Sequence, residues 1–180
     1  MDNLIALVNP NDEVVGFSDK NSVHREGLLH RAFSVFVFNS NGELMLHKRA
    51  LDKYHSPGLW TNTCCSHLPQ GMDMDQACHS RLYEEMGFDT ELSYVTKFHY
   101  RVEFTNGLIE NEIDHIYVGY FNGTPSPNPT EVAGYKWMSL QEISKDIDLN
   151  PNNYTYWTKH IFKNHLEELE EALQLMMEDK

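Results

Sequence analysis

The sequence is short of the features that mark secreted, disulfide-linked and membrane-spanning proteins. It has 3 cysteines, too few and too odd a number for a disulfide scaffold, which is typical of a reducing compartment. No stretch approaches the roughly 20 apolar residues that span a bilayer, and no basic segment leads into an apolar run near residue 1. We therefore expect a cytoplasmic protein without membrane association.

Basic residues are also scarce. The chain has 14 Lys+Arg against 27 Asp+Glu, a formal net charge of −13. Such a chain repels phosphate backbones, so nucleic acid is not an expected partner. A small phosphorylated ligand is still compatible with this charge if a few bases converge locally.

The 180 residues suit one domain, and their apolar patterning alternates between strands and helices. We expect a hairpin over 4–8 and 13–17, further strands over 32–38, 43–48, 92–104, 108–121 and 134–138, and helices over 73–86 and 140–147. Asn106-Gly107 predicts a tight turn between two of the strands. Residues 50–70, with their prolines and little periodicity, predict a long irregular loop. This order predicts a single α+β domain over residues 1–180, in layers around one core.

The C-terminal segment has a helical period. Apolar residues recur at spacings of four and three from Phe162 to Met176, and acidic residues occupy the positions between them. This pattern predicts an amphipathic helix from about residue 155 that packs on the body of the domain.

Histidines and carboxylates form the first candidate site. Glu110 and Glu112 share one face of an extended strand, and Cys65 and His67 have the same spacing. Three imidazoles with two carboxylates would suit a divalent metal in near-octahedral geometry better than a tetrahedral structural zinc. The alternative is a set of surface histidines beside a solvated acidic edge. The three imidazoles of this candidate site are those of His67, His24 and His30.

Three further groups of residues could carry chemistry. Glu84 and Glu85 end a predicted helix, where the helix dipole disfavours anions, so either a cation compensates them or the helix end is simply solvated. Cys65, close to His67, could act as a base or nucleophile, whereas vicinal cysteines are more often small buried hydrophobes. Four scattered bases would bind phosphates if the fold gathers them: Lys20, Arg49, Lys53 and Arg81.

Together these blocks resemble the type 1 isopentenyl-diphosphate isomerases, a branch of the Nudix superfamily. The matching blocks run in family order from about residue 3 to 157 and include Leu29-His30-Arg31-Ala32-Phe33-Ser34, Trp60-Thr61-Asn62-Thr63-Cys64-Cys65-Ser66-His67, Glu84-Glu85-Met86-Gly87 and Ile109-Glu110-Asn111-Glu112. The resemblance implies a Nudix-type α/β/α sandwich with a mixed central sheet. It also implies the interconversion of isopentenyl and dimethylallyl diphosphate by protonation and deprotonation, in isoprenoid biosynthesis.

The resemblance further implies roles for individual residues, and a monomer or weak dimer whose partner is a small isoprenoid diphosphate. Implied catalytic residues are Cys65, Glu112, Tyr100 and Trp157. One divalent ion, Mn²⁺, Zn²⁺ or Mg²⁺, would bind His24, His30, His67, Glu110 and Glu112. A second ion, Mg²⁺, would bind Glu85 and bridge to the diphosphate, which would also contact Lys20, Arg49, Lys53, Ser66 and Arg81.

The chain departs from the hydrolytic Nudix signature G-x5-E-x7-R-E-U-x-E-E-x-G-U, in which U is aliphatic. Aligned from position 66, the Gly is Ser66, the first Glu is Met72 and the Arg-Glu pair is Ser80-Arg81. A hydrolase needs several carboxylates there to bind metal and activate water. Their loss argues against the alternative function, a Nudix pyrophosphohydrolase acting on a nucleotide or other diphosphate.

Overall fold

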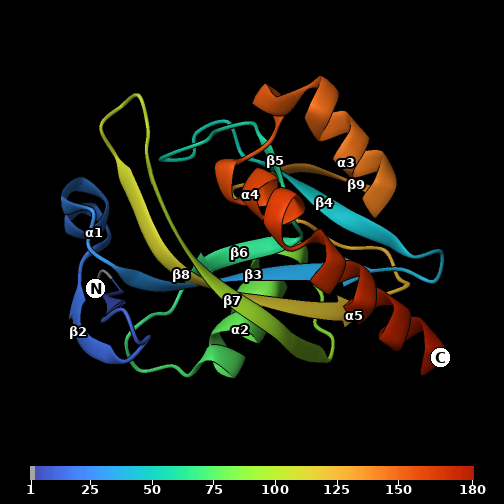
Figure 1. Ribbon diagram of the computed structural model, residues 1–180, viewed down its shortest axis with the longest axis horizontal. Helices are drawn as coiled ribbons and strands as arrows, with labels where there is room; N and C mark the ends of the chain where they lie inside the picture. The colour runs from blue at the N-terminus through green and yellow to red at the C-terminus, as the bar shows by residue number, and fades with distance from the viewer. Residues whose placement is uncertain (1–2) are drawn as a thin grey trace.

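A computed structural model describes residues 3–180, and in this part of the chain nine strands form one mixed sheet (Figure 1). The strands are β1 (Ile5–Val8), β2 (Val14–Ser18), β3 (His30–Phe38), β4 (Glu43–Arg49), β5 (Trp60–Thr61), β6 (Cys64–His67), β7 (Leu92–Glu103), β8 (Ile109–Tyr120) and β9 (Val132–Ser139). The α-helices are α1 (Lys20–Glu26), α2 (Met74–Met86), α3 (Leu140–Leu149), α4 (Tyr156–Asn164) and α5 (Leu166–Glu178), and a short 3-10 turn covers Pro151–Asn153.

Strand β3 is central to the sheet. Its residues from position 32 to 38 are all buried, and this nearly continuous apolar run is typical of a strand covered on both faces. β3 pairs with β6 in antiparallel fashion and with β8 in parallel fashion, with His30 directly opposite Glu112. Because β3 and β8 run in the same direction, their first residues meet at the same edge of the sheet.

Helices cover both faces of the sheet and make two separate cores. Helix α2 buries Leu82 and Met86 against Phe33 and neighbouring residues on one face. Helices α3, α4 and α5 pack on the opposite face (Figure 1), and their buried side chains belong to the same core cluster as Phe36. The prediction of an α+β sandwich with a mixed central sheet is confirmed.

The loop predicted over residues 50–70 was wrong in part, because it contains the two short strands β5 and β6. The sequence of β6, Cys-Cys-Ser-His, has little strand character of its own. It is extended because four of its residues pair with β3, from Ala32 opposite His67 to Val35 opposite Cys64. The predicted turn at Asn106-Gly107 does join β7 to β8, and Gly107 adopts a φ of 83° there.

The C-terminal segment folds as two helices where one was expected from about residue 155. Residue His165 separates α4 from α5 with φ −133° and ψ 17°, outside the helical region, and its backbone N–H donates to the carbonyl of Ile161. The apolar period continues across this break, so Ile161 and Leu169 are both fully buried. Within residues 3–180, no helix combines the length and the hydropathy that crossing a membrane requires.

The turn between β1 and β2 is tied to the sheet by one carboxylate. Asp12 accepts from Arg31 Nε at 2.9 Å, from Lys97 Nζ at 3.0 Å and from His115 Nε2 at 2.8 Å. These partners belong to β3, β7 and β8. The contacts hold the N-terminal hairpin, and the helix α1 that follows it, against the edge where β3 and β8 begin.

Candidate active site and metal centre

Strand β8 presents three carboxylates in a row to the interior. Glu110, Glu112 and Asp114 alternate along the strand, so their side chains share a face, and they are only 1%, 6% and 2% exposed. Three neighbouring buried anions would repel one another strongly without positive charge nearby. Several imidazoles lie close to the first of these carboxylates, Glu110.

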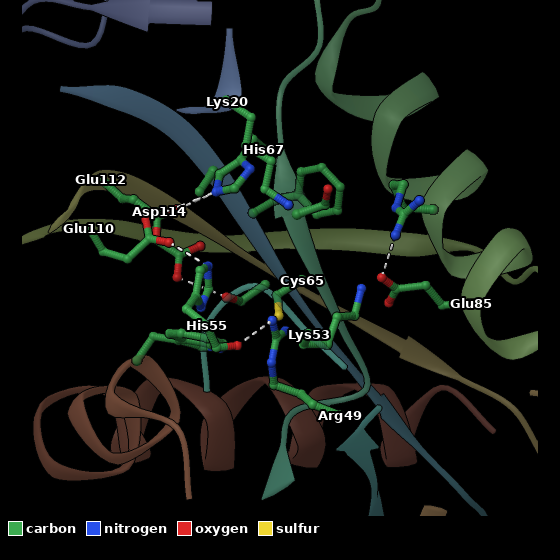
Figure 2. Close-up of a pocket in the computed structure, with 16 residues that line it drawn as sticks. Lys20, Arg49, Lys53, His55, Cys65, His67, Glu85, Glu110, Glu112 and Asp114 are labelled. Carbon is green, nitrogen blue, oxygen red and sulfur yellow. Dashed lines mark hydrogen bonds and ion pairs between the residues drawn. The ribbon is translucent and has the colours of Figure 1, made fainter. Parts of the chain in front are cut away.

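His24, His30, His67 and Glu110 form a compact cluster, of which Figure 2 labels His67 and Glu110. The ligand atoms of all four residues lie within 4.8 Å of one another. Glu110 Oε1 is 3.0 Å from His24 Nε2, and Glu110 Oε2 is 3.4 Å from His30 Nε2 and 4.0 Å from His67 Nε2. The four residues come from α1, β3, β6 and β8, so the fold brings together four of the five residues that the resemblance implied as ligands of this ion.

Backbone carbonyls orient two of these imidazoles. His24 Nδ1 donates to the carbonyl of Lys20 at 2.7 Å, and His30 Nδ1 donates to that of Leu28 at 2.8 Å. A neutral imidazole carries one N–H, so in each ring Nε2 keeps the lone pair that a metal requires. Within residues 3–180 these two Nε2 atoms and Glu110 Oε2 are buried without a hydrogen-bond partner.

The residues therefore fit a divalent cation. Buried polar atoms are normally paired, and here the unpaired ones converge on one point. A set of imidazole nitrogens and carboxylate oxygen is one that several divalent metals accept. Glu112, also predicted as a ligand, lies outside the four-residue cluster but close to it, with Oε2 3.6 Å from both His30 Nε2 and His67 Nε2.

The pKa values of Glu110 and Glu112 are shifted in opposite directions. Burial acts to raise the pKa of Glu110, but its contacts with His24, His30 and His55 hold the pKa well below its usual range. Burial, reinforced by the negative charges of Glu110 and Asp114, raises the pKa of Glu112 well above its usual range. Glu110 thus holds negative charge, whereas Glu112 retains a proton until positive charge offsets its acidic neighbours.

Tyr100 holds Glu112 in place. It lies on β7 directly opposite Glu112, and its hydroxyl donates to Glu112 Oε1. Burial raises the pKa of Tyr100 well above its usual range, so the hydroxyl remains a donor. The predicted tyrosine and glutamate therefore meet directly.

Cys65 and a set of bases share one cavity with the carboxylates (Figure 2). Burial raises the pKa of Cys65 to about 12, so the thiol is protonated at neutral pH. All the predicted catalytic and diphosphate-binding residues except Tyr100 line this cavity. Its lining includes Cys65, Glu112, Trp157, Lys20, Arg49, Lys53, Ser66, Arg81 and Glu85.

The bases gather at one end of the cavity. Lys20 has a lowered pKa because it is buried and because the positive charges of Lys53 and Arg49 lie close to it. Glu85 is buried at 4% exposure, and its Oε1 accepts from Arg81 Nη2 at 2.6 Å. Several cations with a buried carboxylate would suit an anion such as a diphosphate together with a metal ion.

Trp157, near the start of helix α4, lines the cavity. Its indole Nε1 donates to Thr61 Oγ1 at 2.9 Å, and the Arg49 guanidinium lies 5.4 Å from the ring centroid. The aromatic face is therefore held firmly and is already compatible with positive charge.

Comparison with known proteins places the chain in a family. Residues 28–160 match the family described as NUDIX domain. The chain is 45% identical over 164 residues to an isopentenyl-diphosphate Delta-isomerase of Serratia proteamaculans, covering 91% of this chain and 92% of that protein. It is 47% identical over 161 residues to isopentenyl-diphosphate Delta-isomerase 2 of Photorhabdus laumondii, covering 89% and 91%. The chain belongs to the Nudix family, in its isopentenyl-diphosphate isomerase branch.

Solved structures support the Nudix fold. A crystal structure from Deinococcus radiodurans superposes with a TM-score of 0.74 at 18% identity, covering 89% of this chain and 97% of that one. A MutT protein from Methanosarcina mazei superposes with a TM-score of 0.64 at 16% identity, covering 80% and 94%. At such identities these relatives show the fold alone.

Helix α2 is the segment that carries the signature in Nudix hydrolases. In this member of the family, Asp73 caps the helix and Gly87 ends it with φ 73°. Of the two signature glutamates that remain, Glu85 is buried toward the cavity and Glu84 is mostly exposed. The structure thus leaves one signature carboxylate near the site, whereas the buried carboxylates cluster on β8.

Two residues of this Nudix site, Asp114 and His55, were not predicted from the sequence. Asp114 follows the alternation of Glu110 and Glu112, and extending that period by two positions would have found it. Burial raises the pKa of Asp114 to about 7, and its Oδ2 accepts from the Ser34 hydroxyl at 2.8 Å. His55, in the segment between β4 and β5, had no such spacing signal.

Proposed function

We propose that the protein catalyses the interconversion of isopentenyl diphosphate and dimethylallyl diphosphate. The relatives at 45% and 47% identity are named for this activity. The observation that carries the proposal is the shared cavity, where a protonated thiol, Cys65, and a buried carboxylate, Glu112, lie beside a cationic end. Isomerisation of an unactivated alkene requires an acid, a base and an anchor for the diphosphate.

The bases would position the substrate. Lys20, Arg49, Lys53, Ser66 and Arg81 would bind the diphosphate at their end of the cavity, which directs the hydrocarbon toward Cys65 and Glu112.

Cys65 and Glu112 would then move protons. One of them delivers a proton to the terminal alkene carbon, which leaves a tertiary carbocation. The other removes a proton from C2, and the double bond forms in its new position. The two roles exchange when the reaction runs in reverse.

Trp157 and Tyr100 would support these steps. The face of the Trp157 ring attracts positive charge, and so it would stabilise the carbocation. Both side chains are nearly fully buried, which keeps water from capturing the cation. Tyr100, through its hydrogen bond, would hold Glu112 Oε1 so that the other oxygen faces the substrate or the imidazoles.

Two metal ions would complete the site. His24, His30, His67 and Glu110, with Glu112, would hold one divalent ion of Mn²⁺, Zn²⁺ or Mg²⁺, and Glu85 would hold Mg²⁺ beside the diphosphate. When bound, such ions supply positive charge that offsets the buried carboxylates and the diphosphate. Glu112 would thereby keep a fixed orientation and a proton affinity suited to transfer.

Proton NMR tests the proposal directly. The protein is incubated with isopentenyl diphosphate and Mg²⁺ in D₂O, and phosphate release is followed in parallel. We expect dimethylallyl signals to grow with deuterium incorporation and no phosphate to appear. Phosphate without the isomer would replace the proposal with hydrolysis, and the absence of both products would show that the site lacks this chemistry.

A further inference from the structure

His55 is held at a fixed angle inside the cavity. The residue is 7% exposed, although it lies in the segment that links β4 and β5. Its ring stacks on Phe104 with a centroid distance of 5.6 Å and an interplanar angle of 8°. It also meets the Trp157 ring edge to face, at 5.7 Å and 88°. Packing of this kind leaves the imidazole few alternative orientations.

The nitrogen of His55 that faces the site meets the metal-binding carboxylate. His55 Nε2 lies 2.9 Å from Glu110 Oε1, within hydrogen-bonding distance. The other oxygen, Glu110 Oε2, has no hydrogen-bond partner within residues 3–180 and faces His30 and His67. His55 therefore approaches the same oxygen that lies 3.0 Å from His24 Nε2, and leaves Oε2 directed toward His30 and His67.

His55 differs chemically from the clustered imidazoles His24 and His30. Those two rings use Nδ1 as the donor to a backbone carbonyl, so Nε2 presents a lone pair. The Nε2 atom of His55 faces Glu110 as theirs do, but its Nδ1 is buried without a partner in the described chain, so no carbonyl holds the ring proton there. The single proton of a neutral ring is therefore best placed on Nε2, which makes His55 a donor to Glu110.

We propose that His55 is a positioning residue of the metal centre, whose Nε2–H fixes Glu110 Oε1 and so presents Glu110 Oε2 to a divalent cation. The inference rests on the metal site of the proposed function. A residue that donates to a metal-binding carboxylate orients it and tunes its affinity for the ion. The backbone carbonyl of His55 also accepts from Arg49 Nη2 at 3.1 Å, so the same residue joins the metal centre to the cationic end of the cavity.

Two substitutions separate donation from packing. His55→Phe keeps an aromatic ring between Phe104 and Trp157 but removes the donor, whereas His55→Gln keeps an N–H near the position of Nε2 but removes the ring. His79→Phe is the matched control, because His79 pairs with Asp75 and Asp89 on the surface. Circular dichroism establishes that each variant is folded.

Co²⁺ is the probe, and its binding is followed by visible absorption in competition with a chelator. We expect H55F to lose about 10- to 100-fold in Co²⁺ affinity, the usual cost of a lost partner of a metal ligand. H55Q and H79F should stay much closer to the unmodified protein, and the Co²⁺ spectrum of H55F should shift because Glu110 is no longer fixed. If H55F does not fold, His55→Ala against H55Q makes the same comparison.

Other outcomes overturn the inference. Unchanged Co²⁺ affinity in H55F, or equal losses in H55F and H55Q, would mean that His55 acts only by packing. Absence of Co²⁺ binding to the unmodified protein would also overturn it. Failure of the unmodified protein to isomerise isopentenyl diphosphate, with Co²⁺ affinity still lost in H55F, would remove the proposed function and leave the role of His55 intact.

Discussion

Thr61→Val tests whether the aromatic cover of the cavity is held by a buried hydroxyl network. Thr61 is 0% exposed, and its hydroxyl accepts from Trp157 Nε1 at 2.9 Å and from Thr155 Oγ1 at 3.2 Å. The same hydroxyl lies 3.0 Å from Thr158 Oγ1 and donates to Asn62 Oδ1 at 3.0 Å. Valine has nearly the same shape, so the substitution removes these bonds without opening a large cavity.

The loss of stability in T61V depends on which buried groups lose their hydrogen-bond partners. The indole N–H of Trp157 would be left buried without an acceptor, at a cost of about 1–3 kcal/mol. Thr155 and Thr158 would keep each other, because their hydroxyls are 2.9 Å apart. We therefore expect the free energy of unfolding to fall by about 2 kcal/mol, a large share of the stability of an ordinary domain.

Urea unfolding followed by circular dichroism measures this difference. Thr155→Val is the control, because Thr155 belongs to the same network but has no bond to Trp157. We expect it to cost about 1 kcal/mol or less, as one ordinary hydrogen bond does. If T61V is as stable as the unmodified protein, or no less stable than T155V, the network does not hold Trp157 as argued.

Three further predictions concern the acid–base pair, the diphosphate end and the N-terminal hairpin. Cys65→Ala should lower turnover by at least about 100-fold, which is the usual effect of losing a general acid or base, and should leave the thermal unfolding curve unchanged. A folded variant that is still active would exclude the thiol from the mechanism. Glu85→Gln should raise the KM for isopentenyl diphosphate by about tenfold or more. The affinity of the histidine cluster for Co²⁺ should stay the same. Equal losses of substrate affinity and of Co²⁺ affinity would contradict two separate metal sites. Burial acts to raise the pKa of Asp12, but hydrogen bonds from Lys97 and Arg31 outweigh it, so the pKa lies below the ordinary 3.8. The ionised Asp12 therefore stabilises the fold fully above pH 3.8, and this contribution is lost as the pH falls through the lowered pKa. Asp12→Asn should be less stable than the unmodified protein at pH 7, and the difference should shrink as the pH falls below 3.8. A difference independent of pH would refute this.

Much of the site could be predicted because its chemistry is written in short local patterns. Glu110 and Glu112 occupy alternate positions after a tight turn, and a strand necessarily turns both toward one face. The apolar run of β3 likewise predicts a buried strand. The resemblance of the longer blocks then placed three histidines with these carboxylates, which spacing alone could not do.

The remainder depended on contacts between distant segments. Strand β6 exists because its backbone pairs with β3, and its residues Cys64 to His67 carry no strand pattern. His55 reaches Glu110 from a proline-containing segment where nothing in the sequence periodicity marks it. The break at His165 is similar, since the apolar period of the C-terminal segment continues across it. Tertiary pairing decided each of these cases.

The four-residue cluster of His24, His30, His67 and Glu110 also has a topological meaning. An ion shared by these side chains would cross-link segments that are distant along the chain, in the way that a disulfide does, and close loops of 6, 37 and 43 residues. The unfolded chain has no such preformed site, so the free energy of metal binding adds to the free energy of folding, by about 2.7 kcal/mol at a free metal concentration 100 times the Kd. A chelator that removes the ion would then lower the catalytic activity and the thermal stability of the protein together.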